Sequence, residues 1–91
     1  MAYNFTSNTT ADFNGLTPGR EVMVKVSGTF DSATVTPQTQ DNGTDWVDYP
    51  SSALTSAGAN VIVVPTDTVR IAVTGGGGSL DLDVVVQELR D

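Results

Sequence analysis

The acidic residues carry most of the chemical capacity of this chain, and two sets of them have a suggestive spacing. Asp81 and Asp83 are two residues apart in an alternating segment, so an extended backbone places both carboxylates on one face. Paired carboxylates can exchange protons in catalysis or hold a hard cation. On an exposed strand they more often keep a protein soluble and prevent pairing at sheet edges, and we favour that interpretation.

A second acidic set lies in residues 41–45, a run that resembles a calcium-binding loop. Such a loop needs glycine at its sixth position and a distal glutamate, whereas here Gly43 is third and no glutamate follows nearby. Residues 39–46 instead resemble an Asp-box hairpin, T-x-D-x-G-x-x-W, although Asp45 stands where that motif usually has threonine. The resemblance implies a structural role, in which the aspartate caps the turn and the aromatic ring packs beneath it. The residues assigned to this structural turn are Asp41, Asn42, Gly43 and Trp46.

Two residue types that dominate catalytic sites are missing from the chain, which contains no histidine and no cysteine. Disulfides and thiolate chemistry are therefore excluded, and so is the commonest general base. Lys25 is the one candidate base for a serine nucleophile. The glycine run 75–78 lacks the Lys-Ser/Thr pair of a phosphate-binding loop and joins two expected strands. We expect neither an enzyme nor a cofactor or metal site.

The charge balance bears on the choice of partner. Four basic residues face eleven acidic ones, which gives a formal net charge of -7. Nucleic acid and anionic lipid are poor partners for such a chain, because both are bound through clustered Lys and Arg. No signal peptide or long apolar run is apparent, so we expect synthesis in a cytoplasm and no membrane contact.

Hydrophobic alternation indicates the fold. In residues 20–30, Val22, Val24 and Val26 alternate with polar or longer side chains, which is typical of a strand with one buried face. We predict an all-β chain, a single antiparallel β-sandwich of about seven strands over residues 1–91, Ig-like or jelly-roll-like. The other expected strands are residues 33–40, 46–49, 61–64, 68–74 and 79–89.

Two hairpins are expected, and the first does not close simply. A two-residue turn at Asn42-Gly43 would pair Thr39 with Trp46 and put Val47 on the wrong face, so we expect a longer loop or a bulge. Pro37 cannot donate a ladder hydrogen bond, which predicts an edge strand or a bulge for residues 33–40.

The second expected hairpin joins residues 68–74 to residues 79–89. A turn at Gly76-Gly77 would pair Arg70 with Asp83.

The aromatic residues are the candidates for contacts with a partner. Residues 1–15 are weakly patterned but contain three aromatic side chains, so we predict an attachment arm there. Trp46 and Phe30 are assigned to the core. The candidate partner-binding residues are Tyr3, Phe5, Phe13 and Tyr49.

The stretch from Val22 to Val73 resembles small bacteriophage virion structural proteins. Its motifs are structural and concern strands and turns. They are SGTF at 27–30, ATVT at 33–36, DNG at 41–43 with Trp46, ALT at 53–55 and VRIAVTG at 69–75.

The resemblance implies a β-sandwich built into a phage particle, and most specifically a capsid decoration (cement) protein. Such a protein binds the outside of the assembled shell and stabilises it. The implied partners are the major capsid protein or other virion proteins, with a homodimer or homotrimer also plausible. The alternative in the virion is a neck, tail or fibre-base protein. The alternative from another class is a carbohydrate-binding module, which would need exposed aromatic rings on one sheet face.

Overall fold

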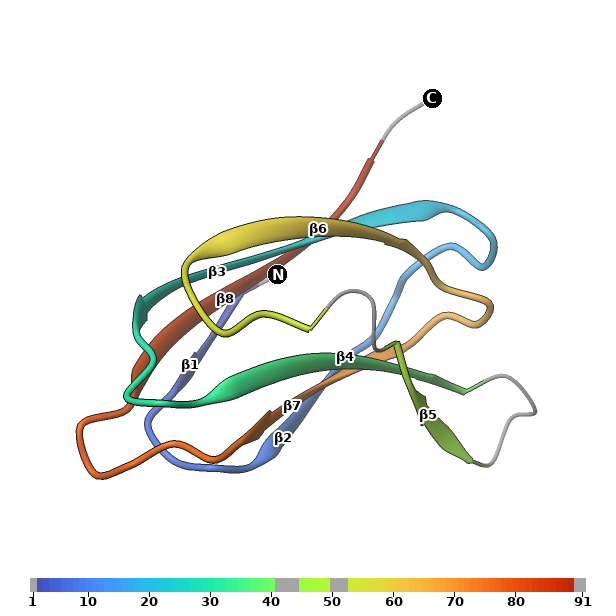
Figure 1. Cartoon of the computed structure of the whole chain (residues 1–91). Coiled ribbons are helices and arrows are strands. Elements are labelled where there is room, and N and C mark those ends of the chain that lie inside the picture. The colour runs from blue at the N-terminus through green and yellow to red at the C-terminus, as the bar shows by residue number, and fades with distance from the viewer. Residues whose placement is uncertain (1, 41–44, 50–52, 90–91) are drawn as a thin grey trace.

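The computed structural model describes residues 2–40, 45–49 and 53–89, and it folds them into a β-sandwich of eight strands (Figure 1). Each sheet is four-stranded and antiparallel. The first sheet has the order β1-β8-β3-β6 and the second has the order β2-β7-β4-β5. The predicted all-β fold is confirmed. The strands are β1 (Ala2–Phe5), β2 (Thr10–Phe13), β3 (Glu21–Thr29), β4 (Thr34–Gln40), β5 (Trp46–Asp48), β6 (Gly58–Val63), β7 (Val69–Thr74) and β8 (Asp81–Glu88).

The core lies between the sheets and is formed by alternating residues of the inner strands. In β3 and β8 the predicted inward residues are fully buried, and the same holds for the inward residues of β7. Since side chains on a strand alternate between faces, the polar residues of these strands face solvent. The buried residues of these three strands include Val22, Val24, Val26, Val69, Ile71, Val73, Leu82, Val84 and Val86.

The N-terminal segment belongs to the sandwich: residues 2–5 and 10–13 are strands and not a separate arm, whereas attachment through this segment stays a prediction. β1 pairs with β8 at one edge of the first sheet, and β2 pairs with β7 at one edge of the second. Phe5 and Phe13 are 0% and 5% exposed and belong to the core. The two short strands look like loop in the sequence because each contributes only one large buried residue.

The predicted hairpin between residues 68–74 and 79–89 is also wrong, because β7 and β8 lie in different sheets. The glycine run between them crosses from one sheet to the other. Two side chains from other connections hold it: the Gly76 amide donates to Asn8 Oδ1 at 2.8 Å, and the Ser79 amide donates to Asp31 Oδ2 at 2.9 Å. The β1–β2, β3–β4 and β7–β8 connections all cross at this end of the sandwich (Figure 1).

The strands of the first expected hairpin, β4 and β5, do pair. Gln40 opposes Trp46, so five residues separate the two strands and the expected longer loop is confirmed. The turn residues Asp41, Asn42 and Gly43 lie outside the described residues, so their structural role stays a prediction.

Pro37 lies in an inner strand, because β4 is between β7 and β5, and the prediction of an edge strand is wrong. The Tyr49 amide donates to the Pro37 carbonyl at 2.8 Å, so the backbone of Pro37 faces the β5 side. Proline has no backbone N–H, so Pro37 cannot donate a second hydrogen bond to Tyr49. The missing bond accounts for the end of β5 at Asp48. Pairing with β7 is undisturbed, because Pro37 and Ile71 oppose each other as a non-hydrogen-bonded pair, which needs no backbone N–H from Pro37.

Candidate binding face

Trp46 lies on the outer face of the second sheet, and its predicted place in the core is wrong. Gln40 opposes Trp46 and Thr39 opposes Val47. Thr39 is buried, so the side chains of Gln40 and Trp46 must point the other way, toward solvent. Of the two aromatics assigned to the core, only Phe30 packs against it.

A row of polar side chains crosses the whole outer face beside Trp46. The strand register aligns Asp12 with Arg70, Arg70 with Gln38, and Gln38 with Asp48. Arg70 Nε donates to Asp12 Oδ1 at 2.8 Å, and Gln38 Nε2 donates to Asp48 Oδ1 at 2.7 Å. Each of the four strands therefore contributes one residue to a row made of two hydrogen-bonded pairs. We call Asp12, Gln38, Trp46, Asp48 and Arg70 the outer-face cluster.

Arg70 is fixed from two directions. Its guanidinium carbon lies 4.2 Å from the centre of the Trp46 ring, a cation–π arrangement, while its nitrogens bind Asp12. The hydrogen bond with Asp12 raises the pKa of Arg70 above its ordinary value. The side chains of Arg70 and Asp12 are 29% and 42% exposed, so they remain accessible to a partner. The predicted pairing of Arg70 with Asp83 is replaced by this one.

The cluster is suited to binding. Both of its carboxylates have a hydrogen-bond partner within the cluster, Asp12 in Arg70 and Asp48 in Gln38. Tryptophan and arginine are the residue types that most often dominate the binding energy of protein interfaces. Because Arg70 is already held in place, its side chain would lose little conformational entropy when a partner binds.

The alternation of Val47 and Tyr49 with Trp46 and Asp48 is the sequence signal that could have located this cluster. Tyr49 is partly buried and packs against the core. Counting back from an inward Tyr49 puts Trp46 on the outside.

The four residues predicted to bind a partner do not form one site. Phe5 and Phe13 are in the core, and Tyr49 packs on its margin in the second sheet. Tyr3, at 46% exposure, lies on β1 of the first sheet with its ring 4.6 Å from that of Phe5. Of the four, Tyr3 alone has a large accessible surface.

Asp81 and Asp83 share one partner. The side-chain amide of Asn4 donates to Asp81 Oδ1 at 2.8 Å and to Asp83 Oδ1 at 2.9 Å. The amide ties β1 to β8 and uses one oxygen of each carboxylate. Among the described residues there is no group of three or more side chains suited to hold a metal ion.

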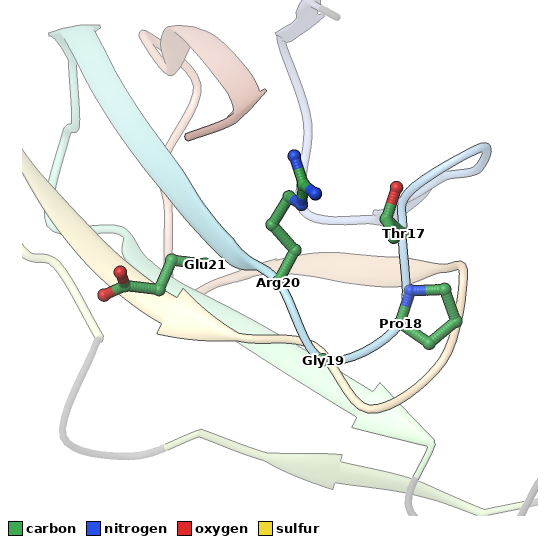
Figure 2. Close-up of a pocket in the computed structure, with 5 residues that line it drawn as sticks. All are labelled: Thr17, Pro18, Gly19, Arg20 and Glu21. Atoms are coloured by element: carbon green, nitrogen blue, oxygen red, sulfur yellow. The ribbon is translucent and has the colours of Figure 1, made fainter. Parts of the chain in front are cut away.

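An open hollow of about 330 Å³ lies where the chain enters β3 (Figure 2). The side chains of Arg20 and Glu21 point in different directions from it, so no set of polar groups converges on a ligand (Figure 2). Nearby, the Thr17 amide donates to Glu88 Oε1. The residues that line the hollow are Thr17, Pro18, Gly19, Arg20 and Glu21.

Glu88 is expected to make the stability of the domain pH-dependent. The hydrogen bond from the Thr17 amide lowers the pKa of Glu88, and the charge on Arg20 lowers it further. A lowered folded-state pKa stabilises the fold above the unfolded value of about 4.3, and this contribution is lost as pH falls through the folded value. Glu88→Gln should therefore lower Tm near neutral pH but not at low pH.

Thermal unfolding of the parent and Glu88→Gln between about pH 3 and pH 7 measures this effect. Glu21→Gln is the matched control, since it removes one negative charge on the adjacent strand. Identical pH profiles for the two variants would contradict a specific role of the Thr17–Glu88 bond.

Comparison of the chain with protein families, with curated proteins and with solved structures finds no match. Within the described residues, no helix has the length and apolar character needed to cross a membrane.

Proposed function

We propose that this protein is a structural component of a bacteriophage particle that decorates the outside of the capsid. Two features support the proposal. The motifs between Val22 and Val73 resemble those of small virion proteins, and the described residues form the β-sandwich that the resemblance implies. The major capsid protein is the proposed partner. A protein that binds only the assembled shell stabilises the shell by mass action.

The observation that carries the proposal is the outer-face cluster. A surface that is ordered before binding loses less conformational entropy in the complex, and here an arginine is held between a tryptophan ring and a carboxylate. The surrounding face carries uncharged side chains, among them Thr34 and Thr36 of β4 and Thr10 of β2. We assign attachment to this face in place of the N-terminal segment, whose Phe5 and Phe13 are buried.

Trp46→Ala is expected to weaken capsid binding by about 30-fold or more, which corresponds to a hot-spot contribution of about 2 kcal/mol. Co-sedimentation of the purified protein with capsids that lack it, over a range of protein concentrations, gives the affinity. Circular dichroism establishes that the variant remains folded, as expected for a residue outside the core.

Tyr3→Ala is the matched control, since Tyr3 is an accessible aromatic residue of the first sheet. Its capsid affinity should equal that of the parent. Loss of binding in Tyr3→Ala with full binding in Trp46→Ala would move attachment to the other sheet. No binding of the parent to any capsid preparation would reject the decoration role.

A place at the neck, tail or fibre base is the alternative within the virion. Images of particles with and without the protein distinguish the two. Density over every capsomer supports decoration, whereas density at a single vertex supports the alternative.

Carbohydrate binding is the second candidate function, and Trp46 is the observation that favours it. A ring on an outer sheet face beside Gln38 and Asp48 offers both a stacking surface and hydrogen-bonding groups. Arg70 covers one face of the ring, so a sugar would stack on the other. Quenching of Trp46 fluorescence by oligosaccharides, with no capsid binding, would favour this function.

A further inference from the structure

The outermost strands of the two sheets differ in how they are protected against pairing with other chains. β1 and β2 have four residues each and β5 has three, so these strands offer few free backbone groups. β2 and β5 also carry charged residues, Asp12 and Asp48. β6 has six residues, no charge and no proline, so it lacks each of these protections.

β6 also exposes apolar side chains beside its free edge. Val61 and Val63 are 48% and 46% exposed, and they are two of the four large hydrophobic residues exposed in the described part of the chain. Ile62 between them is buried, so the valines face outward from the first sheet. On β3, Met23 is half-buried directly opposite Val61 and extends the apolar surface inward from the edge.

The hydrogen-bonding pattern of the first sheet identifies which backbone groups face the free edge. The Leu89 amide donates to the Glu21 carbonyl at 3.0 Å, so odd-numbered residues of β3 bond toward β8. Even-numbered residues of β3 therefore bond to β6, through the even-numbered residues of that strand. Within the described ranges no other strand lies beside β6 on its far side (Figure 1). The residues whose backbone groups face that side are Ala59, Val61 and Val63.

We infer that β6 pairs antiparallel with β6 of a second copy of this chain, about a two-fold axis at Val61. In this register Val61 opposes its own symmetry mate, and Ala59 opposes Val63 of the other copy. These are the residues with free backbone groups, so each opposed pair exchanges two hydrogen bonds. The first sheets of the two copies then form one continuous sheet across the dimer.

The side chains on the outer face are complementary in this register. The central row places Met23 and Val61 against the same two residues of the second copy. The flanking row runs from Glu21 through Val63 to Ala59 and Lys25 of the second copy, because Glu21 opposes Val63 and Lys25 opposes Ala59 within each chain. Glu21 therefore shares a row with a lysine and not with another glutamate. Three strand spacings of about 4.8 Å each separate the two charges, so this arrangement avoids like-charge repulsion without forming an ion pair. The partner of the apolar central row is an identical apolar row, and this self-complementarity favours a second copy over an unrelated strand.

Val61→Lys tests the pairing, because the substitution places two like charges opposite each other on the axis. Sedimentation of the full chain over a range up to about 100 μM should show a dimer for the parent and at least about 30-fold weaker association for Val61→Lys. An equimolar mixture of Val61→Lys and Val61→Glu should recover the dimer, since the opposed charges then attract. Added salt should strengthen the parent dimer, because each copy carries a net charge of -7.

Val47→Lys is the matched control. Val47 is 47% exposed, as Val61 is 48% exposed, but it lies on β5 of the other sheet, so this variant should dimerise like the parent. A monomeric or trimeric parent, or an unchanged dimer in Val61→Lys, would overturn the inference. A monomeric parent whose capsid binding is lost in Val61→Lys would also overturn it, in favour of a capsid strand at β6. The inference does not depend on the proposed function, since a dimer without capsid affinity would leave it intact.

Discussion

Gly28→Ala is expected to destabilise the domain by at least about 3 kcal/mol, the largest effect of any single methyl group added to this chain. Two causes act together. Gly28 has a φ of 111°, a conformation that strains any residue with a side chain. A Cβ atom would also lie 2.2 Å from the Asp81 carbonyl oxygen, which belongs to the backbone of the adjacent strand. Relief of the overlap would require the two central strands of the first sheet, β3 and β8, to separate where β3 ends and β8 begins.

Urea denaturation followed by the fluorescence of Trp46 measures the loss, and the corresponding decrease in Tm is about 12 °C or more. Gly19→Ala is the matched control, because Gly19 has a φ of 82° with no atom within 4 Å of an added Cβ. Gly19→Ala should lose only the stability that corresponds to backbone strain at positive φ, about 1 kcal/mol. Equal losses in the two variants would show that β3 and β8 are not in close approach at Gly28.

The inward-facing residues of the long strands could be predicted from the sequence, but their partners could not. Alternation is a local property, so Val22, Val69 and Leu82 were placed correctly from their neighbours alone. Pairing in a sandwich joins residues far apart in the chain. A glycine run such as residues 75–78 is compatible with both a hairpin and a crossing between sheets. The positions of other strands decide between a hairpin and a crossing: β8 lies between β1 and β3, and β7 lies between β2 and β4, so β7 and β8 cannot pair with each other.

The candidate site was missed for a related reason. Trp46 was assigned to the core because a small domain needs large aromatic side chains there, and the expected longer loop before it left open the face on which it lies. Asp12 and Arg70 are 58 residues apart in sequence, so no local pattern could connect them. The cluster exists only once β2, β7, β4 and β5 are side by side.

The surfaces used by the two proposals lie on opposite sheets. The outer-face cluster belongs to the second sheet, whereas the pairing edge belongs to β6 of the first. Neither surface uses residues of the other, so a β6 dimer would carry two copies of the outer-face cluster. A dimer that binds a shell at two points gains affinity from the second contact without any new interaction at the first, provided that the geometry allows both.

Phe5→Ala is expected to destabilise the domain by about 3–5 kcal/mol, as large aromatic truncations in a core do. Phe5 is fully buried and opposes Leu82 across the β1–β8 pair, so its ring closes the core at one edge of the first sheet. Within a total stability of about 5–15 kcal/mol, this loss leaves a marginal fold or none. Urea denaturation and Tm measure it in the same way as for Gly28→Ala.

Tyr3→Ala is the comparison for Phe5→Ala, because it removes an exposed aromatic ring from the same strand. The Tyr3 ring is 46% exposed and contacts Phe5 at a tilt of 59°, so its removal should cost only about 1 kcal/mol. If residues 1–15 formed an arm for attachment, Phe5→Ala would leave the stability unchanged and weaken capsid binding. The burial of Phe5, together with the proposed attachment through the outer-face cluster, predicts the reverse order. The stability of Phe5→Ala should be much lower than that of the parent. Under conditions in which the variant remains folded, its affinity for capsids should be unchanged, because the outer-face cluster is on the other sheet.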